Sequence, residues 1–205
     1  SMLMVVTVQN SIAFLIAWEI MSLSSFFLVI FENEKKDVIS AGINYLITMH
    51  IAVLFLLSGF IILTLKSGNA DFLSFKNVLG VNNPLSTTVF VILFIGFGIK
   101  AGFVPFHNWL PKAHPAAPSH ISGIMSGVMI KTGIYGILRI LSLMSIPSLE
   151  ICYFVLIISV ISALFGVLYA IAQHNLKRLL AYHSVENIGI IGIGIGIGML
   201  GLTYH

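Results

Sequence analysis

The segment from Gly96 to Pro118, GFGIKAGFVPFHNWLPKAHPAAP, places a lysine beside helix-breaking residues in the middle of an apolar region. Glycines lie on both sides of Lys100, and prolines follow it at positions 105, 111, 115 and 118. Proline removes a backbone donor and clashes with the preceding turn, so a continuous helix cannot run through this segment. The sequence therefore predicts a helix that breaks between Lys100 and Pro118, and such breaks are tolerated in membranes where they line a cavity.

The composition of the whole chain indicates a membrane protein. Of 205 residues, 10 are Lys or Arg and 7 are Asp or Glu, so 8% of the chain is charged, against about 25% in a typical soluble domain. Hydrophobic residues make up 58%, and the mean hydropathy is +1.06. These values exclude a disordered segment, a nucleic-acid-binding arm and an ordinary soluble enzyme domain.

Apolar runs that are long enough to cross a bilayer, about 20 residues per helix, occur along most of the chain. They cover residues 3–31, 38–65, 86 to the break after Lys100, 119–143, 151–172 and 179–203. Strands of a membrane barrel are only about ten residues long, and a longer run satisfies its own backbone in lipid only as a helix. The sequence therefore predicts an all-α polytopic transmembrane bundle of about six spans. The polar stretch 66–85 reads as a surface loop.

The distribution of basic residues predicts the orientation. One side of the bundle receives Lys35, Lys36, Lys112, Lys177 and Arg178, and the other receives Lys66, Lys76 and Arg139. Cytoplasmic loops carry an excess of Lys and Arg. We therefore expect the first group to face the cytoplasm and the chain to lie in the cell (cytoplasmic) membrane.

Three ionisable residues fall well inside predicted spans: Glu19, Lys100 and Lys131. Charge at that depth is expensive, so such residues usually face the bundle interior and mark an ion or proton path. Burial disfavours a charged lysine and a nearby carboxylate favours it, so a lysine between these influences can exchange a proton when its partner moves. We interpret the three as a proton relay; the alternative is an ion pair that only orients helices. Gly123 and Gly127 share a helix face with Lys131 and leave room for water or for a close helix.

Four further residues are weaker candidates for the same path. His50 lies at mid-depth of the second span, and histidine exchanges protons readily near neutral pH. His120 directly follows the proline-rich segment and is placed at the mouth of a path. His183 and Glu186 lie three residues apart on one face of the last span, where they extend the path or satisfy each other.

The sequence predicts neither a metal site nor a bound cofactor. Cys152 is the only cysteine, which excludes an internal disulfide and a CxxC motif. The three histidines around the proline-rich segment, His107, His114 and His120, have no carboxylate or thiolate partner at a zinc-ligand spacing.

Three segments together resemble a known family. They are Lys100-Ala-Gly-Phe-Val-Pro-Phe-His-Asn-Trp-Leu-Pro-Lys-Ala-His-Pro-Ala-Ala-Pro-Ser119, Lys131-Thr-Gly-Ile-Tyr-Gly-Ile-Leu-Arg139 and Ala17-Trp-Glu-Ile-Met-Ser-Leu-Ser-Ser25. In order and spacing they look like the signature of the antiporter-like membrane subunits of NADH:quinone oxidoreductase, multisubunit cation/proton antiporters and membrane-bound hydrogenases. The run from His174 to Gly189, which includes His183 and Glu186, resembles the hydrogenase-4 and formate hydrogenlyase type.

The resemblance implies an architecture and a set of roles. Family members contain two inverted five-helix repeats, so residues 1–205 would be the central part of a longer subunit. Residues 1–145 would be the last four helices of the first repeat and 146–205 the start of the second. By the same resemblance, Glu19 and Lys100 form a gating charge pair and Lys131 is the central relay lysine. The implied partners are other membrane and peripheral subunits of a redox complex, the lipid bilayer, and protons or sodium; no nucleic acid is expected.

Three functions remain open from the sequence. The first is proton translocation within a redox-driven complex. The second is a cation/proton antiporter subunit that exchanges sodium. The third is a non-conducting membrane anchor of a redox complex, in which the ionic groups only fix helix positions. Whether the chain belongs to an enzyme is uncertain, because it would carry no redox centre of its own.

Overall fold

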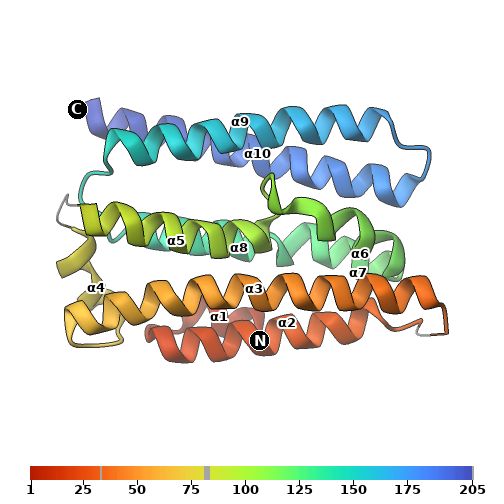
Figure 1. Ribbon diagram of the computed structural model, residues 1–205, viewed down its shortest axis with the longest axis horizontal. Coiled ribbons are helices and arrows are strands. Elements are labelled where there is room, and N and C mark those ends of the chain that lie inside the picture. Colours follow the sequence, from red (N-terminus) through yellow and green to blue (C-terminus); the bar gives the residue numbers. More distant parts are fainter. Residues whose placement is uncertain (33, 81–83, 205) are drawn as a thin grey trace.

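The computed structural model describes residues 1–32, 34–80 and 84–204, and within these ranges the chain forms helices and no strands. Six segments are long and apolar enough to cross a membrane, which confirms the predicted all-α bundle. Figure 1 shows three layers. Helices α9 (Leu149–Ile171) and α10 (Leu176–Tyr204) form one side, the helices within residues 84–141 form the middle, and the helices within residues 2–67 form the other side. Part of the predicted loop 66–85, namely residues 81–83, lies outside the described ranges.

The first span is two helices, where the sequence predicted a single span over residues 3–31. Helix α1 covers Met2–Thr7 and α2 covers Ser11–Val29. The side chain of Asn10 caps α2 by accepting from the backbone N–H of Ile12 at 3.0 Å, and it donates to Asp71 at 3.0 Å. A polar residue that caps a helix start favours a break over continuation. The second span agrees with its prediction and forms α3, Lys36–Ser67.

The stretch 66–85 is only partly the predicted surface loop. It contains a short amphipathic helix, α4 (Phe72–Leu79), whose Phe72, Phe75 and Leu79 are buried. Apolar residues at spacings of three and four form one helix face. The prediction of a surface loop rested on the polar residues of the stretch and did not take this apolar helix face into account.

Arg139 on α8 (Lys131–Leu141) contacts both the break between α1 and α2 and the short helix α4. Its guanidinium donates to the carbonyl oxygen of Val8 at 2.5 Å and to Gln9 Oε1 at 3.0 Å, at the break between α1 and α2. It also lies 3.9 Å from the centre of the Phe72 ring, a cation–π contact with α4. The break therefore has a defined shape, because its free carbonyl groups are bound by a charged side chain.

The predicted break of the third span is confirmed. Helix α5 runs over Pro84–Ala101, and Gly102 then adopts φ of 86°, a backbone conformation that glycine accepts without strain. The chain continues through a short 3-10 turn, Phe106–Trp109, into α6, Leu110–Ala116. Figure 1 shows that α5 occupies one half of the bundle's length and α6 the other half, so α5 ends well inside the bundle.

The fourth span is also irregular, which the sequence did not predict. It consists of α7 (Ser119–Ile124), a π-helical turn (Met125–Met129) and α8. In the π turn the N–H of Ile130 bonds to the carbonyl of Met125, five residues earlier. A π turn inserts an extra residue into a helix and is frequent at functional sites.

Helices α9 and α10 pack closely through glycines, and α10 covers the predicted span 179–203. A Cβ atom at Gly189 would lie 2.3 Å from the backbone nitrogen of Ala163, and one at Gly166 would lie 2.5 Å from the backbone nitrogen of Glu186. Small residues permit this backbone approach in membrane helices.

The same type of contact joins α5 to α8 beside the helix break. A Cβ atom at Gly133 would lie 2.6 Å from the carbonyl oxygen of Phe97 and 2.8 Å from the backbone nitrogen of Ala101. The last turn of α5 therefore lies directly against the first turn of α8.

We predict that Gly133→Val destabilises the protein by about 1–3 kcal/mol, because the new side chain collides with the α5 backbone, which cannot turn away as a side chain can. Thermal unfolding of the detergent-solubilised protein measures this change. Gly194→Val is the matched control on α10, since a Cβ there meets nothing within 4 Å. Equal melting temperatures for the two variants would contradict the close packing of α5 on α8.

Candidate functional site

The centre of the site is Lys100, which stands in the last turn of α5 and has 0% of its surface exposed. Its Nζ donates a hydrogen bond to the hydroxyl oxygen of Tyr45 at 3.0 Å and to Ser22 Oγ at 3.4 Å. The two partners come from α3 and α2. A buried amine at a helix end is thus held by two neutral hydroxyl groups from neighbouring helices.

These groups form a directional hydrogen-bond network. Ser25 Oγ donates to the carbonyl of Ser22 at 2.8 Å, and it lies 2.5 Å from the hydroxyl oxygen of Tyr45. A serine hydroxyl has one proton, so Tyr45 must be the donor to Ser25. The tyrosine then accepts from Lys100. The order of donation runs from Lys100 through Tyr45 and Ser25 to the backbone of Ser22.

The helix break itself is held by Trp109, which contacts the same network. The indole Nε1 of Trp109 donates to the carbonyl oxygen of Ile99 at 2.8 Å, and this carbonyl belongs to the last turn of α5. The ring of Trp109 packs on Tyr45 with a centroid separation of 5.1 Å. The polar end of α5 is therefore satisfied by a side chain that returns from the other half of the broken span, as buried backbone groups require.

Glu19 lies near the network but does not bind Lys100. It is half-buried on α2, one turn before Ser22, so the two side chains share a helix face. The ion pairs within the described ranges are Lys35–Glu32 and His183–Glu186, and neither includes Glu19 or Lys100. The charge pair implied by the family resemblance is thus absent from this structure. The Lys100 amine is bound instead by the hydroxyl groups of Tyr45 and Ser22.

Lys131 stands directly after the π turn, as the first residue of α8. It is half-buried, and its Nζ donates to the carbonyl oxygen of Ser126 within the π turn. A Cβ atom at Gly123 or Gly127 would meet nothing within 4 Å. Of the two interpretations of these glycines, the structure therefore favours open space over a close helix contact within this chain.

The remaining candidates lie elsewhere, and none forms a hydrogen bond or ion pair with either lysine in the described part of the chain. His50 is exposed on α3, with Nδ1 2.9 Å from the carbonyl oxygen of Leu46. His120 is exposed in the first turn of α7. His183 Nδ1 lies 2.6 Å from Glu186 Oε2 on α10, so these two residues do satisfy each other. Their roles in a proton path stay predictions.

No group of three His, Cys, Asp or Glu residues that could hold a metal ion occurs among the residues that the structure describes. The sequence analysis missed three network residues, namely Tyr45, Ser22 and Ser25. Ser22 and Ser25 stand in the quoted segment from Ala17 to Ser25, but no role was predicted for either of them. Ser22 stands three residues after Glu19 on the same side of α2, and this spacing is the signal that could have found it.

Residues 9–204 match the family model described as "NADH:quinone oxidoreductase/Mrp antiporter, TM". The chain belongs to this family. It is 44% identical over 208 residues to hydrogenase-4 component B of Escherichia coli (strain K12), across 100% of this chain and 31% of that protein. It is 35% identical over 203 residues to putative antiporter subunit mnhA2 of Staphylococcus epidermidis (strain ATCC 12228 / FDA PCI 1200), across 97% of this chain and 25% of that protein.

A solved structure of similar fold is a chain of the membrane-bound sulfane sulfur reductase, an archaeal respiratory membrane complex. The TM-score is 0.84 at 23% sequence identity, over 92% of this chain and 39% of that chain. The present chain thus spans about a third of the length of its hydrogenase-4 relative. The family's multi-pass membrane architecture agrees with the six candidate spans.

We predict that Tyr45→Phe lowers the stability of the folded protein by about 1–3 kcal/mol, the range for a buried polar group that loses its partner. The ring and its contact with Trp109 remain, but the Lys100 amine keeps only Ser22 and the Ser25 hydroxyl loses its donor. Tyr169→Phe is the control, because Tyr169 is 45% exposed. A melting temperature for Tyr45→Phe that equals the control's would show that the network contributes nothing to folding.

Proposed function

We propose that this chain forms a proton-translocating part of a membrane subunit in a redox-driven complex of the hydrogenase-4, formate hydrogenlyase or NADH:quinone oxidoreductase type. The observation that carries the proposal is the fully buried Lys100 at a helix break, bound only to neutral hydroxyls. Ionisable residues at such depth face the bundle interior and mark ion or proton paths.

The exchange of partners at Lys100 is the proposed coupling step. A buried charge without an opposite charge is strongly unfavourable, and the carboxylate of Glu19 lies one helical turn from Ser22. In the proposed cycle the carboxylate of Glu19 approaches the amine and compensates its charge, and when that carboxylate withdraws, the amine keeps only its hydrogen bonds to Tyr45 and Ser22. Movement of one residue between these arrangements therefore takes up or releases a proton.

The proposed next carrier is Lys131. The close packing of Gly133 on Ala101 brings the start of α8 against the end of α5, so the two lysines stand on contacting turns of neighbouring helices. The π turn frees a backbone carbonyl that binds the Lys131 amine. A proton that leaves Lys100 thus has a second amine on the adjacent helix, with exposed glycines beside it that leave space for water.

This transport must be driven from outside the chain. Moving one charge through 100 mV requires about 2.3 kcal/mol, and the residues of the site offer no redox group. We propose that redox chemistry in partner subunits of the cytoplasmic membrane moves the Glu19–Lys100 region.

The test of the relay is Lys131→Ala in the assembled protein. We predict loss of proton flux into vesicles, with assembly unchanged, because the side chain is half-buried and bonds only within its own helix turn. Lys66→Ala is the control, since Lys66 is exposed in the last turn of α3. Wild-type flux in Lys131→Ala would reject the relay role.

A second candidate function is sodium/proton exchange, favoured by the 35% identity to a putative antiporter subunit. Transport in proteoliposomes with and without sodium discriminates the two functions. Proton flux that needs sodium supports exchange, whereas flux that is independent of sodium supports the redox-driven pump. A third candidate, a non-conducting anchor, requires that Glu19→Gln and Lys100→Met change assembly but not coupling.

A further inference from the structure

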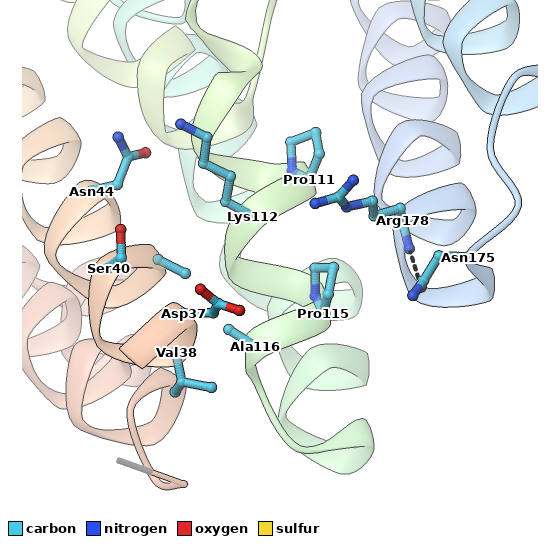
Figure 2. A pocket seen from close by; sticks show the side chains of 11 residues that line it. Asp37, Val38, Ser40, Asn44, Pro111, Lys112, Pro115, Ala116, Asn175 and Arg178 are labelled. Atoms are coloured by element: carbon cyan, nitrogen blue, oxygen red, sulfur yellow. Dashed lines mark hydrogen bonds between the residues drawn. The ribbon is translucent and has the colours of Figure 1, made fainter. Parts of the chain in front are cut away.

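A polar cavity of about 590 Å³ opens at the end of the bundle where α3 and α10 begin and α6 ends. Figure 2 shows its walls: the first two turns of α3 on one side, α6 in the middle and the first turn of α10 on the other side. The charged residues among its lining are Asp37, Lys112 and Arg178. The cavity is separate from the Lys100 network, and the inference below is independent of the proposed transport.

The two cations of the cavity have no anionic partner within the described ranges. Neither Lys112 nor Arg178 takes part in an ion pair there, although Asp37 lines the same cavity. In Figure 2 the Lys112 side chain extends away from Asp37 toward Asn44, and Arg178 extends from α10 toward α6. The three charges leave the lining with an excess of one positive charge. The neighbouring Lys177 is already bound, since its Nζ donates to the carbonyl oxygen of Ala117 at 2.8 Å.

The cavity stands at the ends of three membrane spans. The candidate spans Lys36–Ser67 and Leu176–Tyr204 begin there, and Pro84–Ala116 ends there. Residues at span ends lie at the level of lipid headgroups. The basic residues Lys36 and Lys177 stand at the same end, where Lys35 is paired with Glu32. Basic residues next to membrane helices on the cytoplasmic side attract anionic lipids.

A second, adjoining cavity of about 470 Å³ shares Pro111, Lys112 and Arg178 with the first. It is lined by Tyr169 and Tyr182, whose rings stack with a centroid separation of 5.4 Å. Tyrosine is enriched where one end of the ring is apolar and the other contacts headgroups. Lys112 and Arg178 therefore line a polar cavity on one side of α6, and on the other side a cavity with a wall formed by the rings of Tyr169 and Tyr182.

We infer that this site binds the phosphate of an anionic phospholipid, held between Lys112 and Arg178. One headgroup with a single negative charge neutralises the excess positive charge of the lining. Basic pockets between membrane helices suit such headgroups, and the apolar side chains of Val38, Ala41 and Ala116 in the lining offer contact to the start of the acyl chains. The bound lipid would link the first turns of α3 and α10 to α6.

The experiment measures lipid retention by the protein purified with its full subunit and partner subunits. Native mass spectrometry counts bound lipid after exchange into phosphatidylglycerol or, in parallel, phosphatidylcholine. The variant Lys112→Gln/Arg178→Gln is compared with Lys66→Gln/Lys76→Gln, which removes two exposed charges elsewhere. Each basic side chain near a membrane surface contributes roughly fivefold in affinity, so the cavity variant should bind phosphatidylglycerol roughly 20- to 30-fold more weakly.

Three outcomes would overturn the inference. They are equal retention of the two lipids by the wild type, equal loss in the two double variants, and displacement of phosphatidylglycerol by millimolar inorganic phosphate. The last result would assign the cavity to a soluble anion. Selective retention of phosphatidylglycerol that is lost only in the cavity variant, with assembly and melting temperature unchanged, supports it.

Discussion

The burial of one amine, that of Lys100, is the constraint on which the centre of this bundle depends. In the middle of a membrane protein such a group must find hydrogen-bond acceptors, and here they come from two other helices through Tyr45 and Ser22. The α5 helix must end beside it, because Gly102 and the prolines prevent continuation. Trp109 then satisfies the freed carbonyl of Ile99, which fixes where α6 restarts.

The sequence predicted the regular parts of the fold well and the irregular parts unevenly. Apolar runs of this length satisfy their backbone in lipid only as helices. The proline cluster predicted the break between α5 and α6. The break at Asn10 was not predicted, although Gln9, Asn10 and Ser11 are consecutive polar residues. The residues that bind it, Asp71 at Asn10 and Arg139 at Val8, are distant in the chain. The π turn before Lys131 has no sequence signature at all, since it depends on how the surrounding helices pack.

The sequence likewise predicted some residues of the candidate site and not others. The depth of Glu19, Lys100 and Lys131 in apolar runs was enough to select them, and their location on neighbouring helices agrees with a shared region. Of the partners of Lys100, Ser22 could have been found from its spacing to Glu19, but Tyr45 could not, because it joins the site only after α3 packs beside α2 and α5. The pairing of Glu19 with Lys100 rested on resemblance, and the structure shows the amine bound to hydroxyls. The assignment of residues 1–145 and 146–205 to two repeats stays a prediction.

The most direct test of the account is proton translocation by the assembled protein carrying Lys100→Met. Methionine fills the volume of a buried lysine without its charge, and replacing a buried ionic group with an apolar one is often neutral or stabilising. The account predicts an unchanged or higher melting temperature together with loss of proton flux. Flux at the wild-type level, in a variant that assembles and melts normally, would contradict the claim that Lys100 carries the proton.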